Sequence, residues 1–180
     1  MDPLIACRRA EDAFASVLAK VRPDQAGAPT PCTEWPVRDV VAHVIAGNRW
    51  LAGGQRPQVP GGIEGLIGAY AASAEALYSV LAAPRGLERL YEFPFGPVPG
   101  AVAARMRARD ALTHGWDLAK ATGQVTDLDP ELAADLLDVS RQQITAEHRG
   151  QGRRFAAEQP CDPGRPAADQ LAAFLGRAIG

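Results

Sequence analysis

The sequence contains few cysteines, lysines and aromatic residues, and it carries no marked excess of charge of either sign. Its 180 residues include three cysteines and 6% aromatics, and the formal net charge at pH 7 is −2. This balance offers no basic surface to a phosphate backbone, which disfavours a nucleic-acid-binding protein. No apolar run approaches the roughly 18 residues of a membrane span, so no membrane partner is expected. The start at Met1-Asp2-Pro3 lacks the layout of a signal peptide, and we expect a soluble cytoplasmic protein.

The cysteines are too few and too far apart to form a disulfide framework or a metal-binding pair. Cys7, Cys32 and Cys161 are odd in number and form no CxxC motif, so free thiols in a reducing compartment are expected. A buried structural role is the simplest interpretation of Cys32. Arginine outnumbers lysine 17 to 2, a bias typical of GC-rich genomes that suggests an actinobacterial source.

Proline and glycine divide the rest of the chain into helical segments. The length suits a single domain over residues 1–180. Apolar spacing and capping residues predict helices at about residues 2–21, 37–51, 62–82, 102–121, 129–150 and 167–177. We expect an ordered loop at residues 23–36, a long crossover with one extended segment at 84–100, and a polar stretch at 150–154. The pattern predicts an all-α bundle.

The fourth predicted helix carries polar residues on a face that should be buried. At about 100° per residue, Met106, Asp110 and His114 lie within roughly 120° of Val102, and Asp117 falls on the same face. A carboxylate and an imidazole four residues apart are neighbours on a helix and could share one ion. Burying these two side chains without a partner would cost on the order of several kcal/mol, so we expect a partner that satisfies them.

His43, on the second predicted helix, is the candidate third ligand. It lies roughly 130° from the centre of that helix's apolar stripe, at the flank, where a bundle helix can face a second neighbour. Two imidazoles and one carboxylate are a common set for a divalent transition metal, and three protein ligands leave room for water or substrate. The alternative is that Asp110 and His114 form a hydrogen-bonded pair in the core. Arg107 lies beside His114 and is a candidate for binding an anionic ligand, whereas His148 is expected to be solvated.

Three segments resemble a known family. The segment Pro29 to His43 (PTPCTEWPVRDVVAH) resembles the opening motif of the DinB-like family around the N-terminal, metal-binding domain of mycothiol-dependent maleylpyruvate isomerase. The segments DALTHGWDLA from Asp110 and ATGQ from Ala121 resemble its second signature, and LAAFLGR from Leu171 resembles its C-terminal motif.

The resemblance implies a DinB-like up-down-down-up four-helix bundle with a long crossover and additional C-terminal helices. It also implies that His43, Asp110 and His114 bind a divalent transition metal, with zinc expected and nickel as the alternative. In the isomerase the carboxylate looks to be a glutamate, so Asp110 is shorter by one methylene. The isomerase has a further C-terminal domain that this length does not accommodate, so isomerisation of maleylpyruvate itself is not expected.

Related members resemble S-transferases that use mycothiol or bacillithiol. We therefore expect a metal-dependent, mycothiol-linked transferase or related enzyme acting on a small-molecule substrate, in a cavity lined by Trp35 and Phe95. Trp35 and Arg107 are the candidate cofactor-binding residues. Two alternatives remain open at this point: a non-catalytic ligand-binding or homodimerising bundle, and a thiol-independent, metal-dependent tailoring enzyme of a biosynthetic route.

Overall fold

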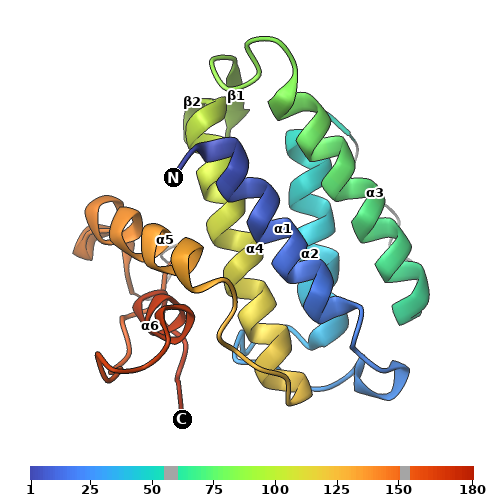
Figure 1. The fold of residues 1–180 in the computed structure, drawn as a ribbon, viewed down its shortest axis with the longest axis vertical. Coiled ribbons are helices and arrows are strands. Elements are labelled where there is room, and N and C mark those ends of the chain that lie inside the picture. Colours follow the sequence, from blue (N-terminus) through green and yellow to red (C-terminus); the bar gives the residue numbers. More distant parts are fainter. Residues whose placement is uncertain (55–60, 151–154) are drawn as a thin grey trace.

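The computed structural model describes residues 1–54, 61–150 and 155–180, and within them four long helices form the bundle (Figure 1). These helices are α1 (Pro3–Leu18), α2 (Val37–Leu51), α3 (Ile63–Ala82) and α4 (Gly100–Thr122). The helix α1 packs mainly on α4, and α2 packs on α3 and α4. The expected all-α, DinB-like bundle with additional C-terminal helices is confirmed.

Local sequence signals account for the start and end of several helices. The Asp2 carboxylate accepts hydrogen bonds from the backbone N–H groups of Leu4 and Ile5, and Pro3 occupies the first turn of α1. The helix α4 ends at Gly123, whose φ of 71° lies in the left-handed region that glycine adopts without steric cost. The helix α2 has the bounds that its valine stripe predicts, because Val37, Val41 and Val44 are fully buried.

The segment between α3 and α4 differs from the expected crossover. It forms an antiparallel hairpin of β1 (Leu90–Phe93) and β2 (Gly96–Pro99), which joins the two helices at the same end of the bundle (Figure 1). Both α2 and α3 run towards this hairpin end, so the crossover lies between them instead. Part of that connection, residues 55–60, lies outside the described residues.

The helix α3 is long and apolar enough, by length and composition alone, to cross a membrane. Its alanines and glycines keep it mildly apolar, although Glu64 and Glu75 interrupt the apolar run. Here it is a bundle helix, with Leu66, Tyr70 and Leu77 buried against its neighbours.

Two predicted helices at the C-terminal side are shorter than expected. The helix α5 (Pro130–Gln143) ends where Ile144 turns into an extended conformation and buries its side chain, and a short 3₁₀ helix, η2 (Ala146–His148), follows. The helix α6 (Ala167–Phe174) ends before Gly176, whose φ is 95°. The N-terminal loop also holds a 3₁₀ turn, η1 (Pro23–Gln25). Of the polar stretch at 150–154, residues 151–154 lie outside the described residues.

The C-terminal segment is anchored on α4. Trp116 is 1% exposed, and its indole N–H donates to the Asp169 carboxylate of α6 at 2.7 Å. This contact places the residues after α6 against the middle of α4, where the candidate site lies.

Candidate metal centre

The structure brings the three sequence-predicted ligands together between α2 and α4. One donor atom from each of His43, Asp110 and His114 lies within 4.8 Å of the other two. The Oδ1 atom of Asp110 is 3.4 Å from His43 Nε2 and 3.7 Å from His114 Nε2. The flank position of His43 on α2 thus faces α4, while the valine stripe faces the core.

Arg107 fixes the Asp110 carboxylate from the other side. Its Nη1 donates to Asp110 Oδ2 at 2.7 Å, which leaves Oδ1 directed at the two imidazoles. Burial by itself would raise the pKa of Asp110, but the Arg107 charge and the nearby imidazoles hold that pKa well below its usual range. Asp110 is therefore ionised at neutral pH, as a metal ligand must be.

Asp117 sets the orientation of the His114 ring. His114 Nδ1 lies 2.9 Å from Asp117 Oδ2, and the Arg177 guanidinium donates to both Asp117 oxygens at 3.3 and 3.1 Å. Although burial opposes it, hydrogen bonds from His114 and Arg177 lower the pKa of Asp117, so this carboxylate is an acceptor only. The proton of neutral His114 therefore sits on Nδ1, and the Nε2 lone pair faces Asp110 and His43.

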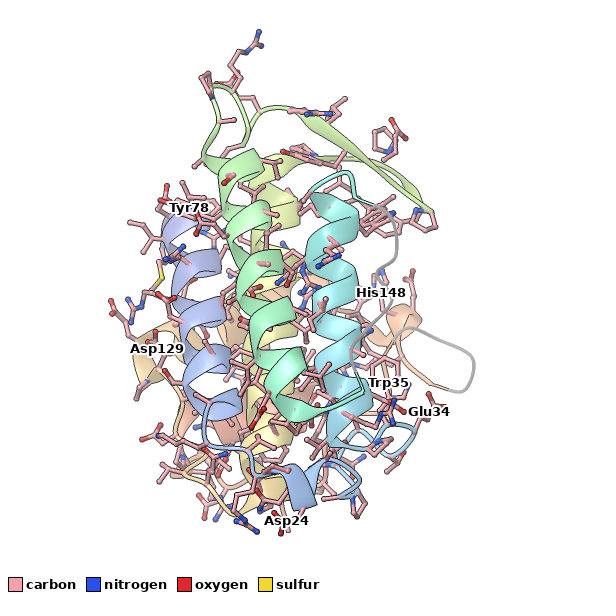
Figure 2. The ribbon with its side chains drawn as sticks, turned by 90° about the vertical axis from the view of Figure 1, so that its right-hand side faces the viewer. Asp24, Glu34, Trp35, Tyr78, Asp129 and His148 are labelled. Atoms are coloured by element: carbon pink, nitrogen blue, oxygen red, sulfur yellow. The ribbon has the colours of Figure 1, made fainter. Side chains whose placement is uncertain are left out.

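Trp35 covers the imidazoles from the loop before α2. Its ring centroid lies 4.5 Å from that of His43 and 5.8 Å from that of His114. The loop is held by a bridge between Pro29 and Pro36 and by Thr30, whose hydroxyl lies 2.7 Å from the Trp35 carbonyl oxygen. Figure 2 shows Trp35 and Glu34 beside the beginning of α2.

Arg107 is itself held by a line of buried hydrogen bonds that reaches α1. Its Nε and Nη2 donate to Asn48 Oδ1 at 3.0 and 2.7 Å, and Asn48 Nδ2 donates to Glu11 Oε2 at 2.8 Å. Burial raises the pKa of Glu11 despite the opposing Arg107 charge. Gly47 leaves the space for this arrangement, because a Cβ there would lie 2.5 Å from Arg107 Nη1. The expected role of Arg107 towards an anionic ligand stays a prediction, and its observed hydrogen bonds are internal.

The triad opens into a cavity of about 590 Å³. Arg107, Trp35 and Phe95, the candidate lining and cofactor-binding residues, all line it.

Cys32 also lines this cavity and lies close to His114 and Asp117, but both Asp117 oxygens already accept hydrogen bonds from His114 or Arg177. Burial raises the pKa of the Cys32 thiol, which fits the structural role expected for it. His148 is exposed and accepts a hydrogen bond from the Thr145 backbone, and it is not among the residues whose donor atoms converge with the triad.

The supporting residues were only partly visible in the sequence. Asp117 could be placed on the same helix face as Asp110, but no pattern assigned it to His114 Nδ1. Arg177 lies 60 residues from Asp117, and Asn48 and Glu11 come from separate helices, so no local spacing connects them.

Comparisons with known proteins identify a matching family and similar chains. A family model described as the mycothiol maleylpyruvate isomerase N-terminal domain matches residues 7–64. Two curated relatives, the uncharacterized proteins Rv0738 and MT0763 of Mycobacterium tuberculosis, are each 50% identical over 183 residues, covering 99% of this chain and 100% of the relative.

Solved structures show the same fold at lower sequence identity. The crystal structure of the mycothiol-dependent maleylpyruvate isomerase superposes with a TM-score of 0.60 at 18% identity, over 82% of this chain and 73% of that one. A mutant of that isomerase gives a TM-score of 0.55 with the same identity and coverage.

Proposed function

The chain belongs to the family of the mycothiol maleylpyruvate isomerase N-terminal domain, and from this premise we propose that it is a metal-dependent enzyme that uses a thiol cofactor. In this proposal His43, Asp110 and His114 hold one divalent transition metal, with zinc expected. Mycothiol is the cofactor and a small electrophilic molecule is the substrate. The reaction is an S-transfer or a related thiol-dependent conversion.

The observation that carries the proposal is the donor set at the base of the cavity. Two imidazole nitrogens and one ionised carboxylate oxygen lie within 4.8 Å of one another. Asp117 holds the other nitrogen of His114, and Arg107 holds the other oxygen of Asp110. Such a ligand set fits a divalent transition metal of intermediate softness, such as zinc, and leaves coordination positions open. When bound, the metal would supply the positive charge that lowers the pKa of a thiol beside it.

The protein's own residues prepare the site in distinct ways. Asp117 retains the proton on His114 Nδ1, so that Nε2 is free to bind. Arg107 keeps Asp110 ionised and turns Oδ1 towards the imidazoles. Trp35 shields the imidazoles on one side, and the cavity of about 590 Å³ is large enough for a small substrate beside the cofactor thiol.

The test is a titration of mycothiol into the metal-free and the zinc-loaded protein, followed by calorimetry. The proposal expects binding that depends on zinc and is lost in His114→Ala. Zinc uptake without any affinity for mycothiol would instead support a thiol-independent metal enzyme. If neither zinc nor nickel raises the melting temperature, the non-catalytic bundle is supported instead, because a ligand of the native state must raise that temperature.

A further inference from the structure

The cavity that holds the triad has a second, aromatic end. The rings of Trp50 and Phe93 meet edge to face with centroids 4.7 Å apart, and Phe93 lies 5.2 Å from Phe95. Trp50 comes from the last turn of α2, whereas Phe93 ends β1 and Phe95 lies in the hairpin turn. Figure 2 shows the hairpin extending over the C-terminal end of α2, which brings these rings together.

The aromatic end is separated from the triad by two turns of α2. His43, Gly47 and Trp50 are spaced by four and three residues, so they share one face of the helix, and all three line the same cavity. Seven residues of helix correspond to roughly 10 Å along the axis. Between the two ends, Gly47 and the Arg107 guanidinium that packs over it both line this one cavity.

The chemistry of this end suits a neutral aromatic group. Trp50, Phe93, Pro94, Phe95 and Met106 are uncharged, whereas Arg107 and Arg109 of α4 also line the same cavity. A charged group placed against the aromatic rings themselves would lose its hydration, and a neutral ring would not. Trp50 and Phe95 are 45% and 53% exposed, so they present apolar surface that a bound ring would cover. Aromatic pairs also favour edge-on and offset arrangements such as the one Trp50 and Phe93 already adopt.

We propose that Trp50, Phe93 and Phe95 form a subsite for an aromatic ring of the substrate. The ring would lie roughly 10 Å from the reacting group near His43, which indicates an elongated arylalkyl electrophile. The location of the reacting group rests on the proposed function, whereas the affinity of this end for a ring does not.

The test uses two sets of probes with and without a ring. The first set consists of phenylalkane thiols with ethyl, butyl and hexyl linkers, each compared with the alkane thiol of the same linker on the zinc-loaded protein. The second compares phenylbutanol with butanol on the metal-free protein. Calorimetry gives the dissociation constants for wild type, Trp50→Leu, Phe95→Leu and the control Tyr78→Ala, whose ring lines a different groove between α1 and α3.

The ring should tighten binding of the hexyl thiol about tenfold or more and have little effect on the ethyl thiol, because only the longer linker reaches Trp50. The gain should fall in Trp50→Leu and Phe95→Leu and persist in Tyr78→Ala. Where the thiols bind, a ring-dependent gain that is absent, equal for every linker, or unchanged in both leucine variants would overturn the subsite. If no thiol binds but phenylbutanol still exceeds butanol and depends on Trp50, the subsite stands and the proposed function fails.

Discussion

His114 and Asp117 are joined by a 2.9 Å contact between Nδ1 and Oδ2, on the side of the imidazole away from Asp110. This contact places the Nδ1 proton and the ring orientation under the control of a carboxylate that is fully buried. Carboxylates that orient a ligand histidine in this way usually contribute strongly to metal affinity.

We therefore predict that Asp117→Asn weakens zinc binding about 10- to 100-fold, because the neutral amide orients His114 less firmly and no longer neutralises Arg177. Competition with a zinc-binding dye measures the dissociation constant. The control is Asp135→Asn, since Asp135 pairs with the N-terminal amine and Arg105 and does not contact the triad. Equal zinc affinity in both variants would contradict this role of Asp117.

Gly47→Ala should disturb the site through Arg107. The new Cβ would lie 2.5 Å from Arg107 Nη1, so the guanidinium must shift away from Asn48 or Asp110. We expect a loss of about 1–3 kcal/mol in the free energy of unfolding, typical of overpacking in a core.

Gly68→Ala is the matched control for that substitution. It lies within α3, where a Cβ would meet nothing within 4 Å, so removing a helical glycine should stabilise the protein by about 0.5–1 kcal/mol. Urea denaturation measures both variants. Unchanged stability in Gly47→Ala would show that Arg107 moves without cost.

The buried Glu11 should make the stability of the metal-free protein depend on pH. Its folded pKa is raised above the usual 4.5, so the native state binds more protons than the unfolded state, and stability falls as pH rises from 4.5 through the folded pKa. Glu11→Gln removes this titration while preserving the shape of the side chain, so its unfolding free energy should not fall over that interval.

Asp117 gives the opposite slope in a separate window. Its folded pKa is lowered below the usual 3.8, so the stability it contributes is complete above 3.8 and is lost as pH falls through the folded pKa. Urea denaturation of wild type and Glu11→Gln isolates the contribution of Glu11 above pH 4.5, whereas Asp117 shares the loss below pH 3.8 with Asp110, whose folded pKa is also lowered. A parallel pH dependence of the two proteins above 4.5 would argue against a raised pKa for Glu11.

The spacing of apolar residues predicts those helices that bury one continuous apolar face. The bounds of α2 and the capping of α1 by Asp2 follow from neighbouring residues, and the spacing of Asp110 and His114 placed both on one face of α4. The end of α5 was wrong, because the burial of Ile144 turns the chain there and only tertiary packing decides that. The sequence pattern predicts one extended segment where the structure has a hairpin, because prolines and glycines obscure the alternation of its short strands.

The residues that hold the ligands in place could not be predicted for a similar reason. Arg107 is directed by Asn48 of α2, and Asp117 by Arg177 from beyond α6, so both depend on how distant segments pack. The role of Gly47 could not be predicted from neighbouring residues, because it leaves space for a side chain of another helix.

The central claim is that His43, Asp110 and His114 form a metal site, and the most direct measurement is the metal content of the zinc-equilibrated protein. We predict about one zinc ion per chain with an increase in melting temperature, as expected for three protein ligands to one ion. Both should be lost in His43→Ala and His114→Ala and retained in His148→Ala. Absence of bound metal in the wild type, or equal binding in all three variants, would contradict the account.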